Sequence, residues 1–253
     1  MEGKVAVVTG GGTGIGRAVT LALAEAGADA VVITYRRSAA EAEQTVADVR
    51  ALGRTAVATA ADVADDGQVR SLADQVVAHF GRVDVLVNNA GMTRAVAHDD
   101  LDGLTDEIWH EVLDVNLVGA FRCVRALAPA LRASRGAVIN IASISGYRAG
   151  GSSIAYGVSK AALLQLTRNL AVALAPEVRV NAVAPGTVAA TRWQPGLHGE
   201  EEFARRAAAE REVVPLRRTA EPEHVAQAVL GLLGMELVTG EAIILDGGKH
   251  VVY

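Results

Sequence analysis

The feature that most constrains this chain is a glycine-rich turn close to its N-terminus. The apolar run Val5–Thr9 predicts a buried strand, and an amphipathic helix is predicted to follow over Ile15–Ala26. Phosphate groups bind to backbone N–H donors at helix N-termini, and glycines at positions 10, 14 and 16 leave that approach open. No Gly-Lys-Ser/Thr follows, which excludes a Walker loop. The turn therefore predicts a phosphate-binding βα junction, with a flexible turn that binds nothing as the plainer alternative.

Short apolar runs alternate with longer amphipathic ones along the whole chain, a pattern typical of βαβ units. We expect strands at Val5–Thr9, Ala30–Thr34, Ala56–Ala60, Val83–Val87, Ala137–Ala142, Arg179–Val183 and Ala242–Leu245. We expect helices at Ile15–Ala26, Ala39–Leu52, Asp65–Phe80, Thr105–Arg132, Ala155–Ala173, Glu200–Glu212 and Pro222–Leu233. Strands that are apolar throughout are buried on both faces. The sequence thus predicts an α/β fold, a single Rossmann-type domain over residues 1–253, with a doubly wound parallel sheet of about seven strands and helices on both faces.

Composition narrows the functional classes. Hydrophobic residues make up 51% of the chain and charged residues 21%, which fits a soluble, enzyme-like protein. The net charge of −5 is spread without basic stripes, so nucleic acid is not an expected partner. We find neither a secretory signal nor a run near the ~20 apolar residues of a membrane span, so we expect a cytoplasmic protein without membrane contact. The single cysteine, Cys123, is expected to be buried filler, and no metal-binding residues are assigned.

The end of the second predicted strand carries a signal for cofactor selection. NAD-selective sites normally offer a carboxylate here to the ribose 2′-hydroxyl, whereas arginine accommodates a 2′-phosphate. The segment Thr34–Arg37 holds two arginines and no acid. Arg36 therefore favours NADP(H), while NAD(H) stays possible. Two solvated arginines at the start of a surface helix are the alternative interpretation.

A tyrosine and a lysine stand four residues apart in the predicted helix Ala155–Ala173. Residues at this spacing share a helix face, so Tyr156 and Lys160 are expected to lie side by side. A phenol with a pKa near 10 exchanges protons poorly at neutral pH, and a nearby ammonium is expected to lower that pKa. Ser143 ends the fifth strand, at the sheet edge where such folds bind ligands, and its hydroxyl could donate to a substrate oxygen. Together these residues predict an acid–base site.

Taken in order, these motifs resemble those of the short-chain dehydrogenase/reductase family over nearly the entire chain. The matching segments are Thr9–Gly16, Asp62-Val63, Asn88–Gly91, Asn116, Ser143, Tyr156–Lys160 and Pro185-Gly186. The resemblance implies an enzyme that moves a hydride between a nicotinamide cofactor and a carbonyl or secondary alcohol.

The resemblance also implies a role for each matching residue. Tyr156 would exchange the proton, and Lys160 would bind the nicotinamide ribose and lower the tyrosine pKa. Ser143 would orient the carbonyl, and Asn116 would hold a water joining Lys160 to bulk solvent. The cofactor would be lined by Gly10, Thr13, Gly14, Ile15, Gly16, Arg36, Asp62, Val63, Asn89, Gly91, Tyr156, Lys160, Pro185, Gly186, Thr187 and Val188.

Plainer roles stay open for three of these residues. Asn116 could satisfy backbone groups inside a helix, where an asparagine is otherwise unfavourable. Asn89, together with Asn88, could order the exit of the fourth strand. Asp62 could cap the helix that begins near Asp65.

Two positions depart from the family pattern. The glycine loop often carries an arginine for the 2′-phosphate where this chain has Thr13, which leaves the NADP(H) assignment resting on Arg36. The loop after the sixth strand usually has a threonine where this chain has Ala190. Either Thr187 or Thr191 is therefore expected to contact the nicotinamide amide.

The segment Asn89–Arg94 resembles that of 3-oxoacyl-(acyl-carrier-protein) reductases, which implies a small-molecule or carrier-bound carbonyl substrate. A substrate loop is expected around residues 187–212, in which Trp193 is either a lid contact or core packing. The basic residues that could dock an acidic carrier, or form a solvated helix face, are Arg122, Arg125, Arg132 and Arg168.

Two alternatives and an assembly state complete the expectations. The enzyme alternative is an NAD(P)-dependent secondary-alcohol, sugar or polyol dehydrogenase that uses the same residues in reverse. The alternative from another class is a non-catalytic dinucleotide sensor, which would need neither Tyr156 nor Lys160. The resemblance further implies a homotetramer packed through the helices at Thr105–Arg132 and Ala155–Ala173 and through the C-terminal strand.

Overall fold

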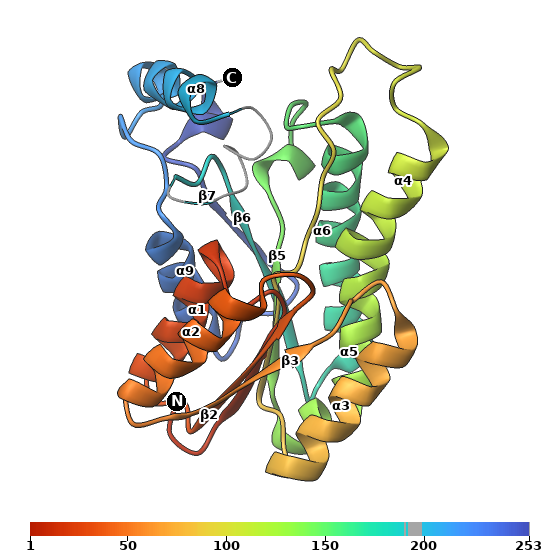
Figure 1. Cartoon of the computed structure of the whole chain (residues 1–253), viewed down its shortest axis with the longest axis vertical. Helices are drawn as coiled ribbons and strands as arrows, with labels where there is room; N and C mark the ends of the chain where they lie inside the picture. Colours follow the sequence, from red (N-terminus) through yellow and green to blue (C-terminus); the bar gives the residue numbers. More distant parts are fainter. Residues whose placement is uncertain (190, 192–198, 253) are drawn as a thin grey trace.

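Seven parallel strands form one sheet at the centre of the molecule (Figure 1). The computed structural model describes residues 1–189, 191 and 199–252. The strands are β1 (Val5–Val8), β2 (Ala30–Tyr35), β3 (Thr55–Ala60), β4 (Val85–Asn88), β5 (Ala137–Ile141), β6 (Arg179–Pro185) and β7 (Ala242–Leu245). Their order is β3-β2-β1-β4-β5-β6-β7, and each neighbouring pair is parallel. The predicted α/β fold with a doubly wound parallel sheet is confirmed.

Helices cover both faces of this sheet. They are α1 (Gly14–Glu25), α2 (Ala39–Ala51), α3 (Asp66–Phe80), α4 (Asp106–Leu113), α5 (Ala120–Ser134), α6 (Ile154–Leu174), α8 (Glu200–Val213) and α9 (Pro222–Gly234). Short helical turns are η1 (Asp114–Gly119), η2 (Ile144–Gly146) and η3 (Lys249–Val251). Figure 1 shows α1, α2 and α9 on one face of the sheet and α3, α4, α5 and α6 on the other.

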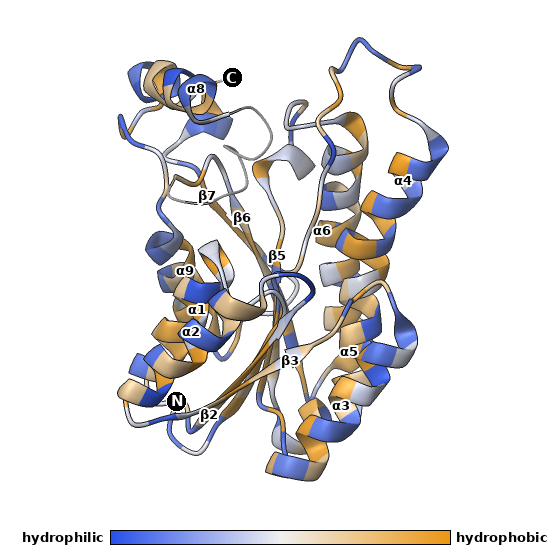
Figure 2. Cartoon of the chain, in the orientation of Figure 1, coloured by the Kyte–Doolittle hydropathy of each residue, from blue (hydrophilic) through white to orange (hydrophobic). Residues whose placement is uncertain are grey.

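The apolar core lies in two layers, because successive strand residues point to opposite faces of a sheet. Ala6 and Val8 of β1 pack in the cluster that α1, α2 and α9 complete, whereas Val7 packs with α3, α5 and α6. All three side chains have no exposed surface. In Figure 2 the helices are largely apolar toward the sheet and hydrophilic on the outside. The continuous apolar strands of the sequence are therefore explained by burial on both sides.

The predicted helix Thr105–Arg132 is not one regular helix, and that expectation is corrected here. A π-helical turn, η1, separates α4 from α5. The turn contains Asn116, whose side chain is 1% exposed and is hydrogen-bonded to two other segments. A π-bulge inserts one residue into a helix and is frequent at functional sites. Apolar periodicity does not reveal such a local insertion.

Strand order places a ligand crevice between β1 and β4. The chain leaves β1 toward β2 on one side and returns to β4 on the other. Open α/β sheets bind ligands beyond the carboxyl ends of their strands at such a switch point.

Cys123 is buried as predicted, and burial raises its pKa to about 12. No helix among the described residues is both long and apolar enough to cross a membrane.

Candidate active site

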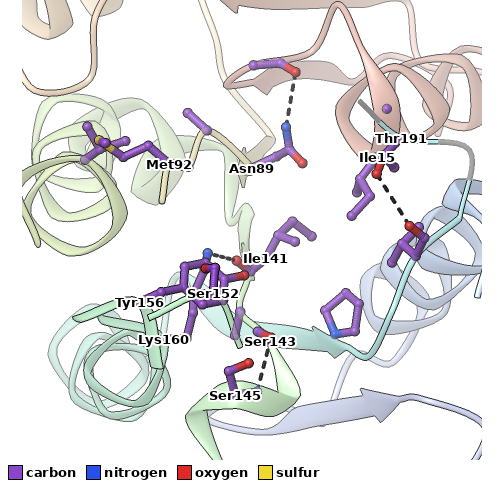
Figure 3. Close-up of a pocket in the computed structure, with 18 of the residues that line it drawn as sticks. Ile15, Asn89, Met92, Ile141, Ser143, Ser145, Ser152, Tyr156, Lys160 and Thr191 are labelled. Atoms are coloured by element: carbon purple, nitrogen blue, oxygen red, sulfur yellow. Dashed lines mark hydrogen bonds between the residues drawn. The ribbon is translucent and has the colours of Figure 1, made fainter. Parts of the chain in front are cut away.

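A cavity of about 630 Å³ opens at the carboxyl ends of the central strands. Most of the site residues predicted from the sequence line it: Gly10, Thr13, Gly14, Ile15, Arg36, Asp62, Val63, Asn89, Gly91, Ser143, Tyr156, Lys160, Pro185, Gly186, Thr187 and Val188. Gly16 and Asn116 are not among the lining residues and lie behind the wall. Residues far apart in the sequence thus converge on one cavity (Figure 3).

The glycine turn is built so that α1 starts at the cavity. Gly10 and Gly14 have φ angles of +64° and +50°, a region that side chains disfavour. A Cβ on Gly16 would lie 2.1 Å from the carbonyl oxygen of Gly10 and 2.6 Å from Nδ2 of Asn89. Gly16 therefore serves close packing of the turn, while Gly10 and Gly14 line the cavity.

Asn89 connects the turn to the neighbouring strand. Its Nδ2 donates to the carbonyl oxygens of Thr9 at 2.9 Å and Gly10 at 3.1 Å, and its backbone N–H donates to the Thr9 hydroxyl. The side chain thus orders the exit of β4, and Asn89 also lines the cavity. The two interpretations of this residue are compatible.

Arg36 and Asp62 form an ion pair at one end of the cavity. The guanidinium Nη1 lies 3.2 Å from Oδ2 of Asp62, and the two side chains are 48% and 26% exposed. Asp62 does not cap α3, because that position belongs to Asp65, which accepts from the backbone N–H of Gln68. The helix-cap interpretation of Asp62 is therefore wrong.

Tyr156, Lys160 and Ser143 meet at another part of the cavity, as Figure 3 shows. The Lys160 Nζ lies 5.8 Å from the centre of the Tyr156 ring and donates to the carbonyl oxygen of Ile141 at 2.8 Å. The Tyr156 hydroxyl is hydrogen-bonded to Ser143. The Ser143 Oγ also accepts from the backbone N–H of Ser145 at 3.1 Å. The expected side-by-side arrangement of tyrosine and lysine is confirmed.

The expected direction of the tyrosine pKa shift is wrong. Burial raises the pKa of Tyr156, and the hydrogen bond from Ser143 offsets only part of that effect. Burial also lowers the pKa of Lys160 to about 8, because this residue, only 5% exposed, is largely removed from water. Sequence spacing indicates proximity of charges but does not report how strongly both groups are desolvated.

The Asn116 side chain links two segments that lie behind these residues. Its Oδ1 accepts from the backbone N–H of Met92 at 2.8 Å, and its Nδ2 donates to the Met92 carbonyl oxygen and to the Ser159 hydroxyl. A Cβ on Gly91 would lie 3.3 Å from Oδ1 of Asn116 and 3.8 Å from Nζ of Lys160. The side chain therefore ties the segment after β4 to helix α6, beside Lys160.

The loop after β6 borders the cavity with Pro185, Gly186, Thr187 and Val188. The Thr187 hydroxyl donates to Oε2 of Glu210 at 2.8 Å. Thr191 also lines the cavity, and its hydroxyl lies 3.4 Å from the carbonyl oxygen of Val188. Ala190 and Trp193 fall outside the described residues, so the roles expected at these two positions stay predictions. The same holds for residues 192–198 of the expected substrate loop.

Sequence reasoning missed several polar residues of this region, among them three charged ones. Arg148 and Lys249 line the cavity, and Glu210 stands behind Thr187 and Lys249. Arg148 follows η2, and only its short distance from Ser143 in the chain could have drawn attention to it. No sequence signal marks Glu210 and Lys249, because they are 39 residues apart and meet only through the fold.

The arginines considered for carrier docking are engaged within the chain. Arg122 pairs with Asp114, and Arg125 pairs with Asp66. Arg132 pairs with Glu177, while Arg168 is hydrogen-bonded to Gln165. These contacts fit a solvated helix face, the plainer of the two interpretations.

Comparison with known proteins identifies the family. Residues 10–250 match the family described as enoyl-(acyl carrier protein) reductase. A candidate ketoacyl reductase of the granaticin polyketide synthase of Streptomyces violaceoruber is 44% identical over 252 residues, covering 99% of this chain and 98% of that protein. A 3-oxoacyl-(acyl-carrier-protein) reductase of Synechocystis is 36% identical over 253 residues, covering 98% of this chain and 97% of that protein.

A solved structure shares the fold. The crystal structure of an NAD⁺-bound xylitol dehydrogenase superposes with a TM-score of 0.88 at 31% identity, covering 98% of this chain and 99% of that one. The likeness spans nearly the full length of both chains. The chain therefore belongs to the short-chain dehydrogenase/reductase family, the NAD(P)-dependent enzymes that interconvert CH–OH and C=O groups.

Proposed function

We propose that this protein is an NADP(H)-dependent reductase of a 3-oxoacyl thioester or a similar ketone. The observation that carries the proposal is the convergence of Ser143, Tyr156 and Lys160 on one cavity that the glycine turn also lines. The names of the ketoacyl and 3-oxoacyl reductases among its relatives support the substrate class.

The described residues fit a dinucleotide. The N-terminus of α1 opens at the cavity with backbone N–H groups and without side chains at Gly10 and Gly14, as a diphosphate requires. Arg36 lines the cavity at the residue that ordinarily faces the ribose 2′ position, and it supports NADP(H). Its ion pair with Asp62 keeps a carboxylate close by, so binding of NAD(H) is the competing outcome.

In the proposed reaction the chain's own residues handle the proton. When bound, the nicotinamide supplies the hydride that reaches the carbonyl carbon. The Ser143 hydroxyl donates to the carbonyl oxygen, and the Tyr156 hydroxyl transfers its proton to that oxygen to complete the alcohol. The ammonium of Lys160 then stabilises the phenolate that remains. Burial raises the pKa of Tyr156, so the phenol carries the proton that reduction requires.

The second candidate function is oxidation of a secondary alcohol, sugar or polyol by the same residues. The structural likeness to an NAD⁺-bound xylitol dehydrogenase favours it. It uses the Tyr156 phenolate as the base that takes the proton of the alcohol.

Absorbance assays with both cofactors separate the candidates. We expect NADPH to be oxidised with an acetoacetyl thioester at a kcat/KM at least tenfold above that with NADH, and little NAD⁺ reduction with xylitol. Faster turnover of polyols with NAD⁺ than of ketones with NADPH would contradict the proposal. Turnover of neither class, with the dinucleotide bound, would favour the sensor.

We also propose assembly as a homotetramer through α5 and α6. Apolar side chains on these helices and on η1 are exposed in the single chain: Val118, Phe121, Val158 and Val172. An exposed apolar surface is a common mark of a subunit interface. Sedimentation velocity is expected to give about four times the mass of the 26.2 kDa chain, and a monomer would contradict this assembly.

A further inference from the structure

A hydrogen-bonded bridge joins three segments beside the cavity. One carboxylate oxygen, Oε2 of Glu210, accepts from the Thr187 hydroxyl at 2.8 Å and from the Lys249 ammonium at 2.7 Å. Thr187 follows β6, Glu210 belongs to α8, and Lys249 begins η3. The side chains of Glu210 and Lys249 are only 14% and 21% exposed. Charge-assisted hydrogen bonds of this kind, partly screened from water, are among the stronger polar contacts in a protein.

The bridge sits in a closely packed surrounding. The backbone N–H of Ala220 donates to the Thr187 carbonyl oxygen at 3.1 Å, and that of Leu216 donates to the Gly247 carbonyl oxygen at 3.1 Å. A Cβ on Gly248 would lie 2.9 Å from Cγ of Pro215. The segment that follows α8 is thus anchored by backbone hydrogen bonds to Thr187 and to Gly247, two residues before Lys249. The Glu210 side chain adds a second anchor, on α8, through its hydrogen bonds with Thr187 and Lys249.

Glu210 acts through its two partners. Thr187 and Lys249 line the cavity, whereas Glu210 is not among the lining residues. The carboxylate holds the hydrogen of the Thr187 hydroxyl, so toward any other partner that hydroxyl acts as an acceptor. It also fixes the position of the Lys249 ammonium and compensates its charge. Loss of the carboxylate would leave a partly buried cation unpaired and free α8 from the cavity wall.

We propose that Glu210 is a positioning residue that holds α8, Thr187 and Lys249 in the arrangement that binds the ketone. The proposal rests on the reductase function proposed above. Apparent affinity falls in proportion to the fraction of molecules in the competent arrangement. Breaking the bridge therefore raises the KM for the ketone and leaves the proton-transferring residues in place.

The test compares E210Q with the matched control E212Q, which makes the same change two residues along α8 at a side chain that is 84% exposed. We expect E210Q to raise the KM for an acetoacetyl thioester about tenfold with kcat within twofold, and E212Q to change neither. Thr187→Val and Lys249→Met are expected to act in the same direction. Thr187→Ser and Lys249→Arg, which keep the donor groups, are expected to stay within about twofold of wild type.

Coupling between the variants distinguishes positioning from general weakening of the fold. In E210Q/K249M the KM is expected to match that of the more impaired single variant, because both changes break one bridge. Multiplied effects, or an E210Q enzyme with the KM of E212Q, would overturn the proposal. Melting temperatures of all variants show which of them are folded, and Thr187→Val serves as the test if E210Q does not fold.

Hydrogen exchange separates a failure of the bridge from a failure of the proposed function. Amides of α8 are expected to exchange at least tenfold faster in E210Q than in E212Q, whatever substrate the enzyme uses. Unchanged exchange would overturn the bridge as a device that holds α8. A wild-type protein that reduces no ketone, but shows this difference in exchange, would contradict the proposed function and retain the positioning of α8 by Glu210.

Discussion

Two parts of the cavity wall are built by different means. At the glycine turn, close packing of the backbone sets the shape: Gly16 lies so close to the Gly10 carbonyl that no Cβ fits between them, and the Asn89 side chain adds hydrogen bonds to Thr9 and Gly10. Where the loop after β6 and η3 border the cavity, a charged side-chain bridge, Thr187–Glu210–Lys249, joins the segments. Backbone positions persist when most side chains are substituted, whereas a side-chain bridge is lost with a single substitution. We infer that the glycine turn fixes the dinucleotide. The wall formed by the loop after β6 and η3 is the part that adapts to the substrate.

Apart from loss of the Tyr156 phenol, the largest expected effect lies at Ser143, which lines the same cavity as both parts of the wall. Ser143→Ala removes a donor to the substrate oxygen and is expected to lower kcat about 100-fold, the typical cost of losing one such group. Binding of NADPH, measured by its fluorescence, should change less than twofold. The control Ser145→Ala keeps the backbone N–H that donates to Ser143 and should stay within fivefold of wild type. Loss of NADPH binding by Ser143→Ala would contradict the inference that the glycine turn fixes the dinucleotide.

The next largest effect concerns the glycine turn. Gly16→Ala forces a Cβ against the Gly10 carbonyl, and overpacking of this kind costs about 1–3 kcal/mol. We expect the free energy of unfolding to fall by about that amount and NADPH to bind about tenfold or more weakly. The control Gly234→Ala lies at the end of α9 with no atom within 4 Å of the added Cβ, and should change neither. Chemical denaturation and fluorescence titration measure both quantities.

A smaller effect is expected from the one charged side chain that we assign to cofactor choice. Arg36→Ser removes the guanidinium and is expected to raise the KM for NADPH about tenfold while leaving that for NADH within twofold. Arg37→Ser, which alters the neighbouring residue of the cavity, is expected to have less effect on this ratio. Equal changes for both cofactors would show that Arg36 does not read the 2′-phosphate.

The smallest effect at the pH of a standard assay, a twofold one near pH 8, follows from the pKa of Lys160, which burial lowers to about 8. Below that pH the lysine is an ammonium and stabilises the phenolate left by proton transfer. As pH rises through about 8 the proton is lost, so kcat for reduction should fall to half near pH 8 and by about tenfold for each further unit. Lys160→Arg, whose charge persists, should remove this inflection. A rate that rises through the same range would contradict the assigned roles.

Much of the fold could be predicted because its signals are local. Apolar runs gave the seven strands to within one or two residues at most ends, and the glycine turn located the start of the crevice. The convergence of Ser143, Tyr156 and Lys160 was predictable from the rule that parallel strands present their carboxyl ends on one edge.

What escaped prediction depends on the assembled fold. The π-helical turn at Asn116 is one extra residue in a helix whose periodicity hardly changes. The raised pKa of Tyr156 reflects burial by several segments rather than the spacing to Lys160. Glu210 and Lys249 look like surface charges in the sequence, and only the packing of α8 against η3 brings them together.

The most direct test of the central claim is the rate of ketone reduction by Tyr156→Phe, with NADPH binding measured on the same preparation. If the phenol supplies the proton beside a bound nicotinamide, kcat should fall by about 10²–10⁴-fold while NADPH still binds within about threefold of wild type. A variant that keeps more than a tenth of the wild-type kcat would contradict the proposed role of Tyr156.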